Sequence, residues 1–286
     1  MSVRRWQLAH GRHLDLGDAS VIMGILNVTP DSFSDGGRFD APSAALDQAR
    51  RMADEGAAII DVGGESTRPG AEPVSAEEEQ RRVLPVIEAL TRIGILVSVD
   101  TYREKTARLA VQAGAHIVND VWGLSREPGI ARVAAQTGAG LVIMHTGRDR
   151  EKLVDGIADQ FQFLHEALGK AEYHGVAREQ IVLDPGFGFA KETVEENVTL
   201  MARMDEVVSL GYPLLVGISR KRFLGTLTGR DTAERDVATA AGNALLRLKG
   251  ADIFRVHDIR ASLDALQVAD AVRKIHVKNE VRRSCI

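Results

Sequence analysis

Residues 23–37, MGILNVTPDSFSDGG, join a short apolar run to a polar loop. The run from Val21 to Leu26 has the length and composition of a buried strand, and it stops at Asn27. Loops that carry acids, hydroxyls and an aromatic side chain at a strand end are disproportionately functional, although a solvated turn favours the same Asp, Ser and Gly residues. The stretch therefore predicts a buried strand followed by either a functional loop or a solvated turn.

The same alternation of apolar run and polar loop recurs along the chain, with segments of helical spacing between the runs. Eight strand–helix units with nearly continuous apolar strands predict a parallel sheet covered by helices. Eight is the number that closes a (β/α)8 barrel, for which about 250 residues is typical. An open doubly wound sheet is the alternative, but it calls for a glycine-rich nucleotide fingerprint that the first loop lacks. The seven further runs are Ala58–Val62, Ile95–Val99, His116–Val118, Leu141–Met144, Ile181–Leu183, Leu214–Ile218 and Ile253–Val256.

The remaining segments indicate how the barrel begins and ends. Trp6–Leu16 alternates in hydrophobicity around Gly11 and predicts an N-terminal β-hairpin. No linker divides the chain, so residues 1–286 are predicted to form a single domain with a core of roughly residues 18–275, and the polar tail 278–286 is expected to fray. Five glycines that precede predicted strands are expected to end helices in the left-handed conformation: Gly56, Gly94, Gly114, Gly140 and Gly250.

Composition narrows the classes of partner. The chain of 286 residues has a net charge of -4, which gives no electrostatic footprint for nucleic acid or for an anionic membrane. Its single cysteine, Cys285, excludes an internal disulfide and is typical of a reducing compartment. No apolar run approaches the roughly 18 residues of a membrane span, and the N-terminus lacks the apolar core of a secretory signal. We therefore expect a cytoplasmic protein without nucleic-acid or membrane partners.

Polar or ionisable residues follow every predicted strand, at the end where (β/α)8 barrels hold their active sites. Ser, Thr, Asp and Asn at such positions are also common helix caps, but Arg, Lys and His are poor caps. Carboxylates and an amide suit the N–H edge of a flat heterocycle such as a pterin or a guanine-like ring, and nearby cations balance those carboxylates or hold an anion. These residues are Asn27, Asp100, Asn119, His145, Asp184, Ser219, Lys221, Arg255 and His257, together with residues 65–68 after the second strand.

Phosphate chemistry is indicated at several of these loops. The amide oxygen of Asn27 could join diphosphate oxygens and waters around Mg²⁺. Residues 66–68 and the loop around Asp31 suit a lid that handles phosphate, and Gly217–Phe223 offers a hydroxyl, backbone N–H groups and a helix start for a carboxylate or phosphate. The sequence contains no Cys/His metal spacing, no Gly-x-Ser-x-Gly elbow and no Walker A motif.

Seven motifs at these strand ends resemble the dihydropteroate synthases. They read NVTPDSFSDGG, GGESTRPGA, SVDT, NDVWGL, LDPGFGF, GISRKRFLG and FRVHD, in that family's order, within residues 21–259. The resemblance implies a pterin-binding (β/α)8 barrel that joins (7,8-dihydropterin-6-yl)methyl diphosphate to 4-aminobenzoate, with Mg²⁺, and releases diphosphate. It also implies a homodimer formed through outer helices, and binding of sulfonamides as mimics of aminobenzoate.

The resemblance implies a role for each matching residue. The pterin would be held by Asp100, Asn119, Asp184 and Lys221, in a pocket lined by Met144 and Phe189. Mg²⁺ would be bound by Asn27, and the diphosphate by Arg255 and His257. The aminobenzoate site would be framed by Phe33, Thr67, Arg68, Pro69 and Ser219, with Gly217 as a further substrate contact. The residues expected to be catalytic are Asp35, Arg68, Asp100, Asp184 and Lys221.

One loop departs from the family pattern. After Met144-His145 this chain reads Thr-Gly-Arg-Asp-Arg-Glu, where many members have a Met-Gln-Gly-(Thr/Ser)-Pro-like loop. The resemblance therefore does not define the shape of the fifth loop, although no expected substrate contact is missing.

Two other functions stay open from the sequence. A methyltetrahydrofolate-dependent methyltransferase would share the Asp and Asn contacts to a pterin, but it has no need for Mg²⁺, Arg68 or the loop after Asn27. A non-catalytic pterin-binding paralogue would show loss of residues from the first or second loop, and both loops are intact here.

Overall fold

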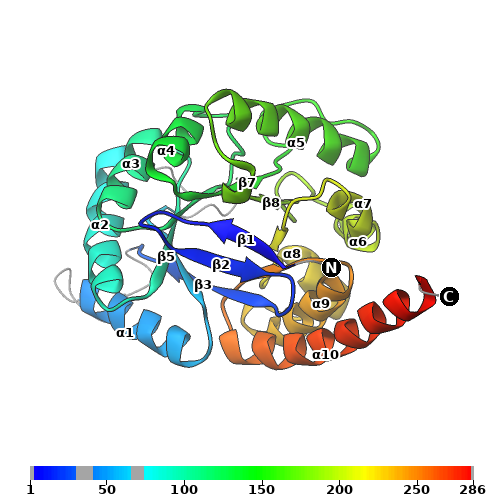
Figure 1. The fold of residues 1–286 in the computed structure, drawn as a ribbon. Coiled ribbons are helices and arrows are strands. Elements are labelled where there is room, and N and C mark those ends of the chain that lie inside the picture. The colour runs from blue at the N-terminus through cyan, green and yellow to red at the C-terminus, as the bar shows by residue number, and fades with distance from the viewer. Residues whose placement is uncertain (1–2, 30–40, 66–73, 285–286) are drawn as a thin grey trace.

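Eight parallel strands form a ring in the computed structural model, which describes residues 3–29, 41–65 and 74–284 (Figure 1). The strands follow the order β8-β7-β6-β5-β4-β3-β10-β9, and a bridge between Leu183 and Leu214 links the two ends of this sheet. The predicted (β/α)8 barrel is thereby confirmed. The strands are β3 (Val21–Asn27), β4 (Ile59–Gly63), β5 (Leu96–Asp100), β6 (Ile117–Asp120), β7 (Gly140–Met144), β8 (Ile181–Asp184), β9 (Leu215–Val216) and β10 (Ile253–Val256).

Helices surround the ring of strands, as the predicted strand–helix alternation requires (Figure 1). Their apolar faces meet the outward side chains of the strands and form the main core. The helices are α1 (Ala41–Asp54), α2 (Ala76–Arg92), α3 (Glu104–Gln112), α4 (Gly129–Thr137), α5 (Gly156–Tyr173), α6 (Val194–Ala202), α7 (Met204–Val208), α8 (Arg222–Thr228), α9 (Asp236–Leu248) and α10 (Ile259–Ser284).

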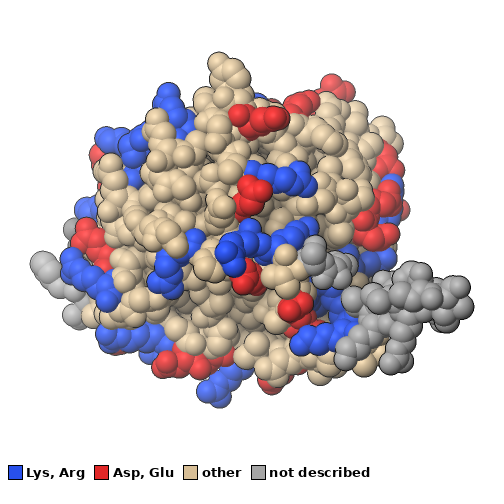
Figure 2. Space-filling model, in the orientation of Figure 1, with Lys and Arg blue, Asp and Glu red and all other residues tan. Residues whose placement is uncertain are grey.

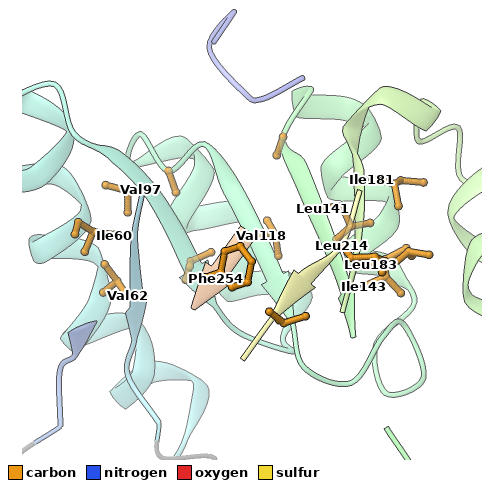
Figure 3. Packing of buried hydrophobic residues seen from close by; sticks show 14 of the residues in the cluster. Ile60, Val62, Val97, Val118, Leu141, Ile143, Ile181, Leu183, Leu214 and Phe254 are labelled. Carbon is orange, nitrogen blue, oxygen red and sulfur yellow. The ribbon is translucent and has the colours of Figure 1, made fainter. Parts of the chain in front are cut away.

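Strand alternation divides the buried side chains between two clusters, because successive residues of a strand point to opposite faces. On β4, Ile60 and Val62 pack outward against the helices, whereas Ile59 belongs to the cluster inside the barrel. Figure 3 shows the outward set, in which Val97, Val118 and Phe254 continue the same layer around the ring. The inward side chains therefore line the interior of the barrel and its mouth.

A β-hairpin covers the N-terminal end of the barrel, formed by β1 (Arg4–Gln7) and β2 (His13–Leu16) (Figure 1). The indole of Trp6 is buried and donates from Nε1 to the carbonyl oxygen of Gln180, just before β8, at 2.8 Å. Trp6 and Leu16 join the inward apolar cluster, so this end of the barrel is filled with hydrophobic side chains. Figure 2 shows acidic and basic side chains interspersed on the face that carries the hairpin.

Some predicted boundaries were wrong. Gly56, Gly94, Gly114 and Gly250 have positive φ as expected, but Gly140 begins β7. The glycine that ends α4 is Gly138, with φ of 71°. A side chain at Gly140 would instead collide with Leu8 and Trp6 of the hairpin segment, so this glycine is explained by packing rather than by capping.

The seventh predicted strand and the C-terminal tail also differ from expectation. The strand predicted over Leu214–Ile218 is reduced to the two residues of β9, because only these pair with β10. The tail predicted to fray from residue 278 continues α10 through Ser284, consistent with a segment free of Gly and Pro and rich in good helix formers. None of the helices in the described ranges is long and apolar enough to cross a bilayer.

Candidate active site

Inward-facing positions at the C-terminal ends of the strands bring the predicted side chains to one mouth. Counting by two from the inward residues Ile59 and Leu96 reaches Asp61, Gly63, Ser98 and Asp100. The same count places Asn27, Asn119, Met144, Asp184, Gly217, Arg255 and His257 inward or directly beyond a strand end. The period of the strands therefore explains why residues on or directly after all eight strands converge.

A buried ion cluster lies in this mouth. Arg255 on β10 donates from Nε to Asp61 Oδ2 at 2.6 Å and from Nη2 to Asp100 Oδ2 at 2.8 Å. Asn119 Nδ2 donates to the same Asp61 oxygen at 3.1 Å. Burial alone would lower the pKa of Arg255, but the charges of Asp61 and Asp100 outweigh it and raise that pKa. Arg255 is therefore the permanent counter-charge of two buried carboxyl groups.

Asp61 is the member of this cluster that the sequence interpretation missed. It lies in the middle of an apolar run, where it was counted as part of a strand and not as a strand end. Its side chain is fully buried, and its Oδ1 has no hydrogen-bond partner among the described residues. An acid at an inward position of an otherwise apolar strand was the signal that could have identified it.

Asp184 and Lys221 form the opposite side of the mouth. Asp184 Oδ1 accepts a hydrogen bond from the backbone N–H of Gly186 at 2.7 Å, and burial raises the pKa of Asp184. Lys221 Nζ donates to the carbonyl oxygen of Phe187 and lies 4.4 Å from the centroid of the Phe189 ring. Burial, with the charges of Arg255 and Arg148, lowers the pKa of Lys221 to about 7 against the opposing effect of Asp184.

Two glycines allow the loop after β8 to adopt this arrangement. Gly186 has φ of 65°, and a side chain there would collide with the carbonyl oxygen of His145. Gly188 has φ of 75°, and an added Cβ would lie 3.1 Å from Cδ of Lys221. The backbone thus approaches both β7 and Lys221 closely, which only glycine permits without strain.

Ser219 and His257 connect the loops after β9 and β10. The Ser219 hydroxyl lies 2.8 Å from His257 Nδ1 and accepts a hydrogen bond from the His257 backbone N–H at 3.1 Å. Gly217 lies beside the base of Arg255, since an added Cβ there would be 3.8 Å from Arg255 Cβ. The predicted substrate contacts on these two loops are therefore neighbours of the ion cluster.

Asn27, Gly63 and Asp100 surround one point of the mouth. An added Cβ at Gly63 would lie 3.7 Å from Asn27 Oδ1 and 3.9 Å from Asp100 Oδ2, so both oxygens face the space above this glycine. No group of three His, Cys, Asp or Glu side chains in the described ranges is arranged to hold a metal ion. This donor set fits Mg²⁺ held by one or two protein oxygens, because Mg²⁺ keeps most of its shell as water and substrate phosphate.

Some predicted residues lie outside the described part of the chain. They are Phe33, Asp35, Thr67, Arg68 and Pro69, together with the rest of the two predicted lid segments around Asp31 and Ser66.

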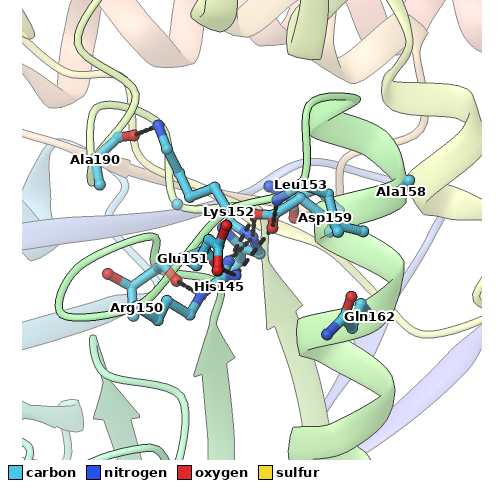
Figure 4. A network of polar contacts seen from close by, with 12 residues as sticks. His145, Arg150, Glu151, Lys152, Leu153, Ala158, Asp159, Gln162 and Ala190 are labelled. Atoms are coloured by element: carbon cyan, nitrogen blue, oxygen red, sulfur yellow. Dashed lines mark hydrogen bonds and ion pairs between the residues drawn. The ribbon is translucent and has the colours of Figure 1, made fainter.

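A second polar network lies at the end of β7, and the sequence interpretation did not identify it. Asp159 of α5 accepts hydrogen bonds from both terminal nitrogens of Arg150, at 2.9 and 2.6 Å, and lies 2.9 Å from His145 Nε2 (Figure 4). Lys191 Nζ lies 3.0 Å from His145 Nδ1. Burial and the cations Lys191 and Arg150 lower the pKa of His145 to about 4, against the opposing effect of Asp159. The fifth loop is therefore anchored by the salt-bridged carboxylate of Asp159.

The raised pKa of Asp100 gives a prediction for stability. Burial first, and repulsion from Asp61 next, outweigh Arg255 and raise the pKa of Asp100 from 3.8 to about 7. The folded state thus holds this proton more tightly than the unfolded state, so the resulting stability is complete below about pH 4 and is lost as the pH rises towards 7. Urea unfolding of Asp100→Asn should show a smaller loss of unfolding free energy over this range than the wild type.

A control variant is available on the outer surface. Asp205 is exposed on α7 and its pKa is lowered by Lys249, so Asp205→Asn should retain the wild-type pH dependence between pH 4 and 7. Equal pH dependence of Asp100→Asn and the wild type would contradict the raised pKa of Asp100.

Comparison with known proteins agrees with this site. The family model described as "Pterin binding enzyme" matches residues 23–257. The chain is 46% identical over 260 residues to the dihydropteroate synthase of Bacillus subtilis, covering 91% of this chain and 90% of that protein. A Xanthomonas albilineans dihydropteroate synthase structure with 4-aminobenzoic acid has a TM-score of 0.89 and 44% identity, covering 95% of this chain and 99% of that one.

A second structure of the Xanthomonas albilineans enzyme, in complex with 7,8-dihydropteroate, has a TM-score of 0.84 and 41% identity, covering 93% of this chain and 98% of that one. The resemblance inferred from the seven motifs is confirmed by these matches. The chain therefore belongs to the pterin binding enzyme family and, within it, to the dihydropteroate synthases.

Proposed function

We propose that the barrel mouth condenses (7,8-dihydropterin-6-yl)methyl diphosphate with 4-aminobenzoate to form 7,8-dihydropteroate and diphosphate. The observation that carries this proposal is the set of buried acceptors, Asp100, Asn119 and Asp184, facing cations at Lys221 and Arg255. A pterin presents an amino and ring N–H edge that pairs with carboxylates, and its ring carbonyl needs a donor. The alternatives of a methyltransferase and of a non-catalytic paralogue gain no support from these relatives, which are synthases.

Each side of the mouth has its own task in this reaction. Asp184, Asp100 and Asn119 bind the pterin edge, with Met144 and Phe189 lining the pocket and Lys221 donating to the ring. Arg255 and His257 stabilise the departing diphosphate. Arg255 is held in position for this by its hydrogen bonds to Asp61 and Asp100. Ser219, beside His257, contributes to the aminobenzoate site, which Phe33, Thr67, Arg68 and Pro69 would complete.

The chemistry favours departure of the leaving group before full attack. The aniline nitrogen of aminobenzoate is a weak nucleophile, so stabilisation of the departing diphosphate lowers the barrier more than base catalysis does. The pterin ring delocalises positive charge on the methylene carbon, and the buried carboxylates stabilise that charge electrostatically. Exclusion of water then protects the cation until the amine attacks it. Asp35 and Arg68 are assigned here to the loops that close over the substrates.

We assign Mg²⁺ to the oxygens above Gly63. Asn27 Oδ1 would hold the ion, with Asp100 Oδ2 nearby and diphosphate oxygens and waters in the remaining positions. Bound there, Mg²⁺ would neutralise charge on the diphosphate oxygens.

We also assign a homodimer to the surface formed by α9 and α10. These helices pack side by side (Figure 1). They also expose apolar side chains at helical spacing. The α10 residues are spaced by four and three positions, so they lie on one face of the helix. An exposed apolar stripe across two helices is typical of a protein interface. The side chains are Val237, Leu245, Leu248, Val268, Val272 and Ile275.

Substitution of Asp184 tests the catalytic assignment. Asp184→Asn should lower kcat/KM for the pterin diphosphate by roughly tenfold to a hundredfold, since it removes one charge-assisted pairing with the pterin edge. Diphosphate release from both substrates is the assay, and Asp205→Asn on the outer surface is the matched control. Near-normal kinetics of Asp184→Asn would refute its pterin role, and no turnover by the wild type would refute the proposed reaction.

Substitution of Asn27 tests the metal assignment. Asn27→Ala should raise the Mg²⁺ concentration needed for half-maximal diphosphate binding by roughly tenfold, in the range expected when a metal ligand or its support is lost. Isothermal titration of diphosphate at a series of Mg²⁺ concentrations measures this without turnover. Diphosphate affinity that is independent of Mg²⁺ in the wild type would exclude the metal site.

A charge on the apolar stripe tests the dimer. Leu245→Glu should convert a dimer into a monomer in analytical ultracentrifugation, because a carboxylate would be buried unpaired in the interface. Tyr173→Glu is the control, since Tyr173 on α5 is 86% exposed and lies on a different helix. A wild-type protein that sediments as a monomer at micromolar concentration would disprove the assignment.

A further inference from the structure

Arg148, in the loop after β7, occupies a position that none of the roles above explains. It lies within the segment where the chain departs from the family pattern. Its guanidinium carbon is 3.9 Å from the centroid of the Trp122 ring and 4.8 Å from the centroid of the Phe189 ring. Trp122 follows β6 and Phe189 follows β8, so this side chain joins the loops on either side of its own.

The guanidinium is held in place by neutral partners. Nε donates to Thr146 Oγ1 at 2.9 Å, and Nη2 donates to the carbonyl oxygen of Val121 at 2.5 Å. None of the ion pairs among the described residues involves Arg148, in contrast to Arg150, which pairs with Asp159. The guanidinium therefore lies over the two aromatic rings without an ion pair in the described part of the chain, and the charges of Asp100, Asp149 and Asp120 act on it at longer range.

Hydrogen bonds hold the loop segment that follows Arg148. Asp159 accepts hydrogen bonds from Arg150 and from the backbone N–H of Leu153, at 2.8 Å for the latter (Figure 4). Lys152 donates to the carbonyl oxygen of Ala190 at 2.6 Å, which ties this loop to the residue after Phe189. This hydrogen bond connects the loop that carries Arg148 with the loop that carries Phe189.

Arg148 belongs to the pterin side of the mouth. Phe189 is contacted by Lys221 Nζ as well as by Arg148. In the ring of strands β7 is four positions from β3, so Arg148 lies across the barrel from Asn27 and the assigned diphosphate site. A contact with the leaving group is therefore not the role that this geometry supports.

We propose that Arg148 is a positioning residue for the pterin, because its guanidinium bridges Trp122 and Phe189 and holds the Phe189 ring at the pocket beside Lys221. This role rests on the proposed function and deepens it. A guanidinium over an aromatic face is a directional contact that an ammonium reproduces only in part, because Lys lacks the planar group. The ligand class that this arrangement serves is a flat heterocycle that packs on Phe189.

Affinity measurements test the positioning role directly. Arg148→Ala should weaken binding of 6-hydroxymethylpterin, titrated by calorimetry, by roughly tenfold, since two cation–π contacts are lost. The KM of the pterin diphosphate should rise similarly, whereas the KM of aminobenzoate should change less than about twofold. Arg148→Lys should recover only part of the pterin affinity. Arg126→Ala is the matched control, because Arg126 contacts the rings of Trp122 and Tyr102 without contacting Phe189.

A pH profile separates this role from general support of the loop. The charged groups that act on Lys221 are Asp184 at the end of β8, Arg255 on β10, Lys191 and Arg148. Arg148→Met retains much of the stem but removes the charge that lowers the pKa of Lys221. The pH above which pterin affinity falls should therefore move to a higher value in this variant. Arg148→Lys keeps the charge and should leave that pH near its wild-type value. A loss of loop structure alone would lower affinity without moving that pH.

The outcomes are distinguishable from those of the proposed reaction. Unchanged pterin affinity in Arg148→Ala, or equal losses for pterin and aminobenzoate, would overturn the positioning role. A loss as large in Arg126→Ala as in Arg148→Ala would overturn it as well. Absence of turnover by the wild type would refute the synthase reaction, while the pterin titrations would still support or overturn the role of Arg148.

Discussion

Two carboxyl groups inside the barrel depend on one guanidinium. Asp61 and Asp100 are buried on neighbouring strands, and Arg255 donates to both of them. Buried charges are costly unless they are paired and hydrogen-bonded, and removal of one partner leaves the others uncompensated. The remainder of the mouth is arranged around this cluster, since Asn119 also donates to Asp61 and Gly217 leaves room beside Arg255.

The register of the strands explains why the cluster needs a long cation. Arg255 pairs with Met23 on β3, and Met23 pairs with Ile59 on β4, two residues before Asp61. Two residues of a parallel strand rise about 6.6 Å, and the stagger of a barrel repeats such offsets around the ring. The guanidinium must therefore extend from a lower level of β10 up to the carboxylates. An arginine has this reach together with two separate donor directions, which an ammonium lacks.

The inward side chains change from apolar at the N-terminal end of the barrel to polar at the mouth, where the candidate active site lies. The N-terminal end is filled by inward apolar side chains and is covered by the hairpin with Trp6. Two residues further along β4, β5, β6, β8 and β10, the next inward residues are polar or charged: Asp61, Ser98, Asn119, Asp184 and Arg255. The apolar layer thus fixes the strands that hold charged groups at the mouth, where chemistry takes place.

The sequence alone predicted the barrel because eight apolar runs are a strong periodic signal, and it predicted Asp100, Asn119 and Asp184 because each ends such a run. It did not reveal Asp61, whose position inside a run hides an inward carboxylate, nor the partnership of Arg255 with two acids, which depends on register. Gly140 was misinterpreted because a glycine required by contact with Trp6 and Leu8 has the same local pattern as a helix cap. The anchoring of the fifth loop by Asp159 joins residues of a loop and a later helix, and no local pattern encodes that pairing.

A crystal structure of the protein with a bound pterin tests the central claim most directly. The account predicts that the amino and ring N–H edge of the pterin faces Asp184, Asp100 and Asn119, with the ring packed near Phe189 and its methylene substituent directed towards Asn27 and His257. A pterin bound away from this mouth, or bound there with its amino edge turned from all three acceptors, would contradict it.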